Sequence, residues 1–230
     1  MWVEYATPEN IDSRIWPRTA AIAERLWSPA DTVDVNSMYR RLEVMSLRLE
    51  ESGLTHRSSY QIMLQRLAGS GPVEPLKTLA DVVEPVKEYA RSSSRDYTQQ
   101  TPLNRLVDAA RPESEVARIF SNMVDRLDHN REAVQTWLTL WRDNDAKLSP
   151  AIRRSPLLNE VDPLSQDLAN LAALGLKALD YRESGKRPPD SWVKDASAFL
   201  GRAKQPRAEV SIAVVPPIEK LVTATQKQRR

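Results

Sequence analysis

The sequence predicts a mainly helical protein, and three observations support this class. The 230 residues contain only six glycines, and most of the 16 prolines fall between periodic segments. Apolar residues recur at helical spacing through long charged stretches, whereas strand composition is limited to the short run SIAVV at residues 211–215. With 41% hydrophobic residues, the chain can bury the core of one large domain or of two small ones.

Three helices are expected near the start of the chain. The first spans residues 11–27 with an irregular entry, because Pro17 suits a first helical turn and Pro29 stops the segment. A shorter helix starts at Ser59 and carries the apolar residues Ile62, Met63, Leu64 and Leu67.

The helix between them is expected to begin after a cap at Asn36 or Ser37 and to end near Ser52. Gly53 follows at the position where a left-handed residue commonly ends a helix. The apolar stripe of this helix consists of Met38, Leu42, Met45 and Leu49.

The stretch GSGPVEP at residues 69–75 predicts a domain boundary. We therefore expect one domain over residues 1–68 and a second over residues 69–230. In the second domain, RSSSRDYTQQTP at residues 91–102 has the composition of a polar loop.

The second domain is expected to be an α-helical bundle. Its longest helix spans residues 112–147 and is bounded by Pro112 and Pro150, and two further helices span residues 164–184 and 189–202. The strand-like run SIAVV has no obvious partner, and two prolines end it at once.

Charge and composition argue against several classes of partner and cofactor. The net charge is only +2, and its basic groups are mixed along the chain apart from the terminal QKQRR, so no nucleic-acid partner is expected. No run approaches the ~20 apolar residues of a membrane span, so no membrane partner is expected either.

No metal or other cofactor is expected. The chain has no cysteine, and its two histidines, His56 and His129, lack ligand spacing. The stretch RDNDAK at residues 142–147 resembles the start of a calcium loop but lacks the turn glycine and the closing glutamate. A Ser–His–Asp arrangement is not excluded by residue order, but no nucleophile-elbow motif supports one.

The start of the chain does not resemble a signal peptide, because Glu4, Pro8 and Glu9 interrupt any apolar stretch. Either the protein is cytoplasmic or its true N-terminus is missing, so the sequence leaves the localisation unassigned.

Trp2 and Glu4 are the candidate binding residues. In an extended segment, side chains at i and i+2 point to the same face, which places an indole beside a carboxylate. That pairing suits a sugar, whose C–H face stacks on the ring while its hydroxyls donate to the carboxylate. Without further context, Trp2 would be a core aromatic and Glu4 a solvated charge.

The context is a longer motif that begins at these residues. W-x-E-Y is followed by N-x-D-S-R-x-W-P-R-x-A-A-x-A-E-R-L-W-S, and the later stretch YRRLEVMSLRLEESGLTHR continues the pattern. The motif resembles the end of the catalytic domain of family 20 glycoside hydrolases, the β-N-acetylhexosaminidases, and the stretch after it resembles the following helix of bacterial members. The resemblance covers residues 1–68, and the rest has a general likeness to the helical extensions of bacterial relatives.

This resemblance implies a fold and a ligand. Residues 1–68 would hold the tip of the last strand and the final helices of a (β/α)8 TIM barrel, followed by the α-helical bundle. Trp2 would form a wall of the pocket for a terminal N-acetylhexosamine of a glycan, and Glu4 would accept hydrogen bonds from its hydroxyls.

Other motif residues are expected to be structural. Trp16 and Trp27 would be core residues of a helix. Arg14 and Arg18 would either hold the motif in shape by pairing with carboxylates or lie exposed.

No catalytic residue is assigned in this chain. Family 20 enzymes use substrate-assisted catalysis with an adjacent Asp–Glu pair in an H-x-G-G-D-E-like motif, and no such motif occurs here. The adjacent Glu50 and Glu51 fit a solvated helix face better. The chain is therefore read as the C-terminal fragment of a longer glycosidase, inactive by itself.

Loss of the preceding strands would also expose the barrel-facing helices, which would favour self-association. The alternative is an autonomous helical protein-interaction module, in which the two long helices between residues 112 and 184 bind a partner chain.

Overall fold

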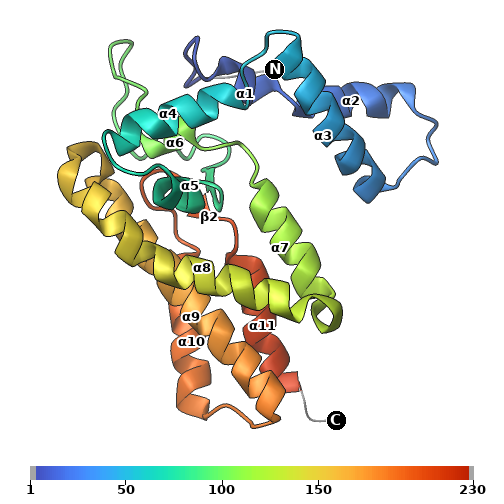
Figure 1. Cartoon of the computed structure of the whole chain (residues 1–230), viewed down its shortest axis with the longest axis vertical. Helices are drawn as coiled ribbons and strands as arrows, with labels where there is room; N and C mark the ends of the chain where they lie inside the picture. The colour runs from blue at the N-terminus through green and yellow to red at the C-terminus, as the bar shows by residue number, and fades with distance from the viewer. Residues whose placement is uncertain (1–3, 228–230) are drawn as a thin grey trace.

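The computed structural model describes residues 4–227 and shows a mainly helical chain, which confirms the predicted fold class (Figure 1). Trp2 and most of the predicted strand tip lie outside the described residues. The helices of the first half are α1 (Ile11–Ile15), α2 (Arg18–Trp27), α3 (Val35–Glu51), α4 (Ser58–Ala68), α5 (Glu74–Ala80) and α6 (Leu106–Ala109).

The first predicted helix is in fact two helices. Trp16 adopts an extended conformation (φ −106°, ψ 153°) between α1 and α2, and Pro17 precedes the first turn of α2 instead of lying inside a continuous helix. The extended residue separates the two helical segments, so the expected single helix over residues 11–27 is wrong.

Helix α3 ends as predicted but has a different cap. Asp34, not Asn36 or Ser37, caps it, because the Asp34 Oδ1 atom accepts a hydrogen bond from the Ser37 N–H at 2.9 Å. Gly53 has the positive φ of 97° that a glycine tolerates after a helix.

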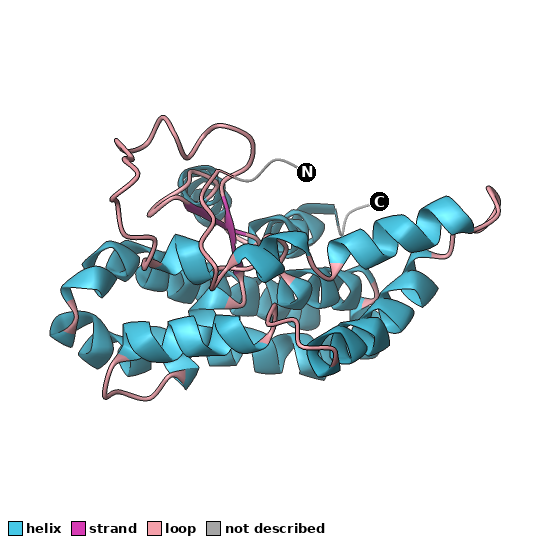
Figure 2. Ribbon diagram, turned by 90° about the horizontal axis from the view of Figure 1, so that it is seen from above, coloured by secondary structure: helices cyan, strands magenta, loops and turns pink. Residues whose placement is uncertain are grey.

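The second half contains the long helices of the predicted bundle. These elements are α7 (Glu115–Asp125), α8 (Leu127–Arg154), the 3₁₀ helix η1 (Pro156–Val161), α9 (Asp162–Ser184), α10 (Asp190–Ala203) and α11 (Val215–Lys227). Figure 2, seen from above, shows the helices lying side by side beneath a loop-rich upper part.

The predicted helix over residues 112–147 differs from the structure at both ends and in the middle. Arg126 has non-helical angles (φ −118°, ψ 42°) that separate α7 from α8, and the chain changes direction there (Figure 1). Ser114 caps α7 by accepting from the Ala117 N–H at 2.9 Å. Pro150 lies within α8, which continues to Arg154 because Ala151 and Ile152 are buried.

The short strand predicted near residue 211 does have a partner. β2 (Val210–Ile212) pairs antiparallel with β1 (Val83–Pro85), with Val83 opposite Ile212. Pro216 and Pro217 then fall in the first turn of α11, where their missing N–H groups are not needed. This last helix was not predicted.

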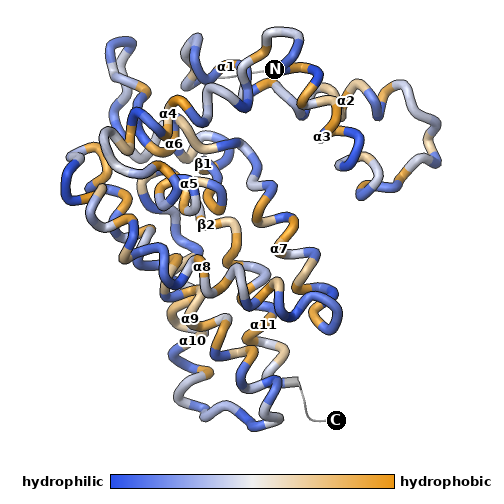
Figure 3. Tube along the Cα trace, in the orientation of Figure 1, coloured by the Kyte–Doolittle hydropathy of each residue, from blue (hydrophilic) through white to orange (hydrophobic). Residues whose placement is uncertain are grey.

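The core is formed by one cluster of buried apolar side chains. It begins at Tyr60 in α4 and extends through α5, α6 and the long helices, and its largest fully buried members are Trp141 and Phe120. Along the tubes of α8 and α9, hydrophobic and hydrophilic positions alternate, as amphipathic packing requires (Figure 3). Helix α4 contributes to this cluster although it precedes the predicted domain boundary. The boundary between residues 68 and 69 stays a prediction.

Helices α2 and α3 contrast with this core. All of α2 is described and none of its residues is buried, and in α3 only Ser46 is. The exposed apolar residues of this region include Ile22, Leu26, Trp27, Val33, Val35, Val44, Met45 and Leu47.

Among the described residues, no helix has both the length and the apolar character needed to cross a lipid bilayer.

Candidate functional site

The two predicted sugar-binding residues lie at the edge of what the structure describes. Trp2 lies outside the described residues, so its predicted position next to Glu4 stays a prediction. Glu4 is described and exposed. The next residue, Tyr5, is half-buried, and its contacts show which residues hold this segment in place.

Tyr5 packs against the loop that precedes α6, within the second predicted domain. Its ring centroid lies 4.6 Å from that of Tyr97. The guanidinium carbon of Arg91 lies 4.3 Å from the Tyr5 ring centroid and 5.0 Å from that of Tyr97. Both partners come from the polar loop expected over residues 91–102, which therefore contacts the start of the chain.

Arg91 is buried and belongs to an ion-pair network. Its Nε donates to Glu209 Oε2 at 2.8 Å, and its Nη2 donates to Asp108 Oδ1 at 2.6 Å. Burial would lower the pKa of Arg91, but the hydrogen bonds and charge interactions with Asp108 and Tyr97 together outweigh it, so the pKa lies above its ordinary value. Arg91 therefore stays charged.

A second arginine completes the network. Arg105 donates from Nη1 to Glu209 Oε1 at 2.9 Å and from Nε to Glu160 Oε1 at 2.8 Å. The Tyr97 hydroxyl also donates to Glu209. Burial would raise the pKa of Glu209, but the hydrogen bonds from Tyr97 and Arg105 lower it. The buried charges are thus paired and hydrogen-bonded, as burial of ions requires.

The motif residues after Tyr5 hold the first turn in shape. The Asn10 side chain accepts from the Thr7 N–H at 2.8 Å and donates from Nδ2 to the Tyr5 carbonyl at 3.4 Å. Asp12 Oδ2 accepts from the Thr55 N–H at 2.8 Å, which ties α1 to the turn after α3.

The sequence left open whether Arg14 pairs with carboxylates or lies exposed, and the structure shows a third arrangement. It pairs with backbone carbonyls rather than with carboxylates: it donates to Ala110 at 2.9 Å, to Asp108 at 2.8 Å and to Val107 at 3.3 Å. Burial lowers its pKa to about 10. Because these acceptors lie in and just after α6, Arg14 connects the motif to the second predicted domain, residues 69–230.

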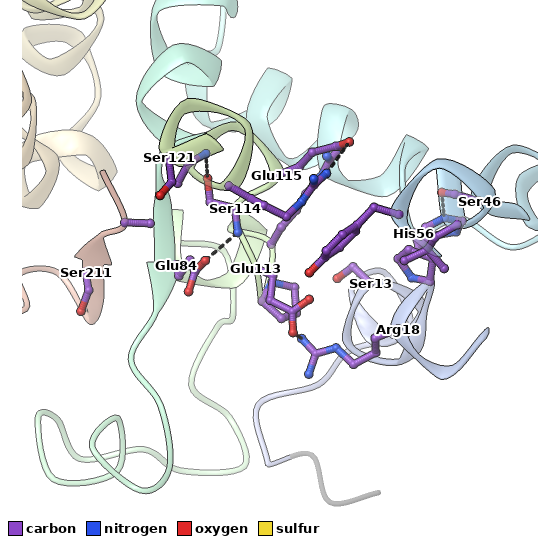
Figure 4. A pocket seen from close by; sticks show the side chains of 18 of the residues that line it. Ser13, Arg18, Ser46, His56, Glu84, Glu113, Ser114, Glu115, Ser121 and Ser211 are labelled. Carbon is purple, nitrogen blue, oxygen red and sulfur yellow. Dashed lines mark hydrogen bonds and ion pairs between the residues drawn. The ribbon is translucent and has the colours of Figure 1, made fainter. Parts of the chain in front are cut away.

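A cavity of about 690 Å³ opens between α1–α3 on one side and β1, α7, β2 and α11 on the other. Figure 4 shows Ser46 and His56 near one end of this cavity and Ser211 at the other. Trp16, Pro17 and Arg18 of the motif line it, whereas Glu4 does not. Glu4, the predicted sugar-binding residue that the structure describes, and this cavity are therefore separate features.

Several charged residues in this cavity are held by charged, backbone or aromatic partners. Arg18 lies 3.5 Å from Glu113, and Figure 4 shows the two side chains facing each other. Arg18 thus has a carboxylate partner, one of the two alternatives expected for it. Glu84 accepts from the Ser114 N–H at 2.7 Å, and the Arg118 guanidinium lies 3.8 Å from the centroid of the Tyr39 ring. Paired charges among apolar side chains suit contact with protein better than acid–base chemistry.

Ser46, His56 and Glu50 meet at the edge of the cavity. Ser46 Oγ lies 2.6 Å from Nε2 of His56, and Nδ1 lies 3.4 Å from Glu50 Oε1 without forming a hydrogen bond. Burial lowers the pKa of His56, which favours the neutral ring.

This arrangement is better explained as a structural tie than as a catalytic triad. Glu50 Oε1 accepts from the backbone N–H groups of Arg57 at 2.5 Å and Ser58 at 3.3 Å. Ser46 lies within α3, whose regular backbone uses its N–H groups internally, so they do not supply an oxyanion hole. The three side chains connect α3 to the start of α4.

Two expectations about tryptophans are wrong. Trp27 is 91% exposed and is not a core residue, and Trp16 is only half-buried and lines the cavity. Trp27 does lie in a helix, as predicted, but nothing in the described part of the chain covers it. Within residues 4–227, no group of three or more His, Asp or Glu side chains could hold a metal ion.

Comparison with known proteins shows what the chain is similar to. The family "Glycosyl hydrolase family 20, catalytic domain" matches residues 1–30. The mouse (Mus musculus) β-hexosaminidase subunit beta is 37% identical over 60 residues, which cover 26% of this chain and 11% of that protein. The probable β-hexosaminidase fdl of Drosophila melanogaster is 42% identical over 59 residues, which cover 24% of this chain and 9% of that protein.

A solved structure matches nearly the whole chain. The X-ray structure of Flavobacterium johnsoniae chitobiase superposes with a TM-score of 0.86 and 31% sequence identity, covering 96% of this chain and 34% of that one. The fold and the motif are thus similar to those of a glycoside hydrolase segment. More specifically, the chain resembles the C-terminal part of a family 20 β-N-acetylhexosaminidase with a helical extension. It spans about a third of the chitobiase and about a tenth of the mouse relative.

Proposed function

We propose that this chain is the C-terminal portion of a β-N-acetylhexosaminidase that removes terminal N-acetylhexosamine residues from glycans. The observation that carries the proposal is the family 20 match over residues 1–30, which includes both Trp2 and Glu4. In this role the two residues bind the sugar and perform no proton transfer.

The proposed mechanism divides the work between this chain and the rest of a barrel. The acetamido oxygen of the substrate attacks the anomeric carbon, and an Asp–Glu pair from another strand orients that group and protonates the leaving oxygen. Trp2 stacks on the sugar ring, and Glu4 accepts hydrogen bonds from its hydroxyls. A hydrogen bond to a charged group contributes about 1.5–3 kcal/mol, so Glu4 would strengthen binding of the substrate appreciably.

The burial of α2 and α3 supports a role as one part of a larger fold. Both are amphipathic helices, yet Ser46 is the one buried residue among them. A (β/α)8 barrel of about 250 residues would offer its strands and neighbouring helices to such faces. We propose that the missing barrel covers Leu26, Trp27 and their apolar neighbours.

The first test is genetic and enzymatic. The coding sequence upstream of the Met1 codon should encode barrel strands and an H-x-G-G-D-E-like motif, and the joined polypeptide should hydrolyse a chromogenic N-acetylglucosaminide. The purified 230-residue chain alone should not, because it contains no such motif. Hydrolysis by this chain alone would refute its proposed incompleteness.

The second test concerns the binding residue. In the joined polypeptide, Glu4→Gln should raise KM for the glycoside more than it lowers kcat, because the change removes a charged acceptor from the binding pocket. Glu51→Gln, on the exposed face of α3, is the matched control. Equal KM values for the two variants would contradict the binding role of Glu4.

The second candidate function is an autonomous helical interaction module. The exposed apolar residues favour it, since Leu26 is 79% and Trp27 is 91% exposed in the isolated chain. In that case the upstream DNA would encode no barrel, and the chain would bind a partner chain or another copy of itself.

A further inference from the structure

We infer that Arg91 and Tyr97, in the loop that precedes α6, are positioning residues for the segment that carries Glu4. This inference rests on the proposed function and deepens it, because it assigns the helical extension a part in sugar binding. Neither residue touches the sugar in this proposal. Each acts through Tyr5, which follows Glu4 directly in the sequence.

The contacts around Tyr5 hold its ring and its backbone from two sides. The ring packs on Tyr97, at 4.6 Å between centroids, and on the guanidinium of Arg91, at 4.3 Å from its carbon. On the other side, the Asn10 side chain donates to the Tyr5 carbonyl at 3.4 Å. The segment leading to Glu4 is thus held both by the motif itself and by the loop that carries Arg91 and Tyr97.

Arg91 is itself fixed by groups from two distant parts of the chain. Asp108 of α6 and Glu209, just before β2, accept its hydrogen bonds at 2.6 and 2.8 Å. Arg91 is 5%, Asp108 0% and Glu209 7% exposed, so the three charges are enclosed in protein. A buried arginine with two carboxylate partners has little freedom to move.

Tyr97 is connected to the same anchor. Arg91 donates from Nε and from Nη2 to the Tyr97 hydroxyl at 3.1 and 3.0 Å, and Arg105 donates to it at 3.1 Å. The ring that contacts Tyr5 is therefore oriented by the buried network and not merely by loop packing. Any displacement of this network would be transmitted to Tyr5.

Accurate placement matters because a binding residue works only within a narrow range of positions. Binding constellations need their groups within about 0.5 Å of the productive geometry. A looser Tyr5 would spread Glu4 over several positions and weaken its contact with the sugar. The catalytic Asp–Glu pair of the proposed barrel lies on another strand, so the effect should fall on KM rather than on kcat.

The experiment compares two tyrosine-to-leucine changes in one loop. Tyr97→Leu removes the ring that contacts Tyr5, whereas Tyr89→Leu removes a ring that is 71% exposed. In the joined polypeptide, Tyr97→Leu should raise KM roughly threefold or more with kcat unchanged, the order expected from loss of one aromatic contact. Tyr89→Leu should leave both constants at their wild-type values.

A second pair of variants tests the partner ring. Tyr5→Phe keeps the aromatic contact and should retain the wild-type KM, whereas Tyr5→Leu should raise it as Tyr97→Leu does. In the 230-residue chain, hydrogen exchange of the amides of residues 5–10 should be faster in both leucine variants and unchanged in Tyr89→Leu. This readout needs no enzymatic activity, and circular dichroism checks that each variant is folded.

The outcomes separate this inference from the proposed function. An active wild-type enzyme whose KM is the same in Tyr97→Leu and Tyr89→Leu overturns the positioning role and leaves the glycosidase intact. A joined wild-type polypeptide that does not act on N-acetylhexosaminides overturns both. Faster exchange at residues 5–10 together with a raised KM supports the inference.

Discussion

Gly175 of α9 lies directly against Leu138 of α8. A Cβ atom added to the glycine would come within 2.8 Å of Leu138 Cδ2 and within 3.1 Å of its Cδ1. Leu138 is fully buried, so its methyl groups have little space into which they could move. The absence of a side chain at position 175 lets the two longest helices of the bundle approach each other closely.

Gly175→Ala should therefore destabilise the protein. Overpacking a tight core costs about 1–3 kcal/mol, which exceeds the ~1 kcal/mol that alanine gains over glycine in a helix. We expect a net loss of about 1 kcal/mol in the free energy of unfolding, measured by urea denaturation with circular dichroism.

Gly201→Ala is the matched control and should have the opposite sign. Position 201 lies in α10, is exposed, and has no atom within 4 Å of an added Cβ. Alanine should stabilise this helix by about 0.5–1 kcal/mol. Stabilisation by both alanines would show that α8 and α9 are less tightly packed at Gly175 than the structure indicates.

The buried His56 should make stability depend on pH. Burial lowers its pKa in the folded state below the ordinary value of 6.5, so the unfolded chain binds the proton more readily. The contribution of neutral His56 is fully present above pH 6.5 and is lost as the pH falls toward the lowered pKa. The free energy of unfolding should decline over this window, before carboxylates such as Glu50 begin to titrate.

Variants of the two histidines test this assignment. His56→Gln should be less stable at neutral pH and should lack most of the decline just below pH 6.5. His129→Gln, at an exposed position of α8, should retain the decline. Thermal unfolding at several pH values measures both. A decline that survives in His56→Gln would assign the effect to other groups.

Much of the helical fold could be predicted from local pattern, but its interruptions could not. The stripe of apolar residues located α9 almost to the residue, because it coincides with the buried face. The break at Arg126 leaves the apolar spacing nearly intact, so the periodicity carried no sign of it. Pro150 was read as a helix end, whereas burial of Ala151 and Ile152 lets α8 continue past it.

The prolines at positions 216 and 217 show that a local signal can also hide a helix, since α11 was not predicted. They end a strand and also suit the first turn of a helix, and the sequence before them favoured the strand reading. The partner of β2 lies in β1, more than a hundred residues earlier, and only the folded chain brings the two together. Local signals are ambiguous wherever tertiary packing makes the choice.

The motif drew attention to Glu4 as a candidate binding residue but gave no sign of Arg91 and Tyr97, which contact the neighbouring Tyr5. Arg91 and Tyr97 lie in a polar, serine-rich stretch whose composition is that of an exposed loop. Their burial depends on Asp108 and Glu209, which are distant in the sequence. The prediction for Trp27 was wrong for the converse reason: its pattern is that of a core residue, but no part of the described chain covers it.

Self-association of the isolated chain should depend on the exposed face of α2 and the loop after it. Leu26→Glu combined with Trp27→Glu should shift sedimentation velocity profiles toward the monomer, because two large apolar surfaces are replaced by charges. Leu140→Glu, at a 45% exposed position of α8, is the control and should leave the profile unchanged. A wild-type chain that stays monomeric at high concentration would contradict the expected association.

Arg14 should contribute substantially to the stability of the junction between the motif and the second predicted domain, residues 69–230. Its guanidinium supplies hydrogen bonds to three carbonyls around the end of α6, at 2.8, 2.9 and 3.3 Å. Arg14→Met keeps most of the apolar stem but leaves these acceptors without the charged donor, which should cost about 2 kcal/mol. Arg40→Met, at an exposed position of α3, should change the free energy of unfolding by less than about 0.5 kcal/mol.

Hydrogen exchange distinguishes a local effect of Arg14 from a global one. Because its acceptors belong to residues 107–110, exchange should accelerate there and in α1 before it does in α8 and α9. An Arg14→Met variant as stable as Arg40→Met would mean that water replaces the arginine at these carbonyls. The motif would then be attached to residues 69–230 through the contacts of the Tyr5 ring with Arg91 and Tyr97 and through the pair of Arg18 with Glu113.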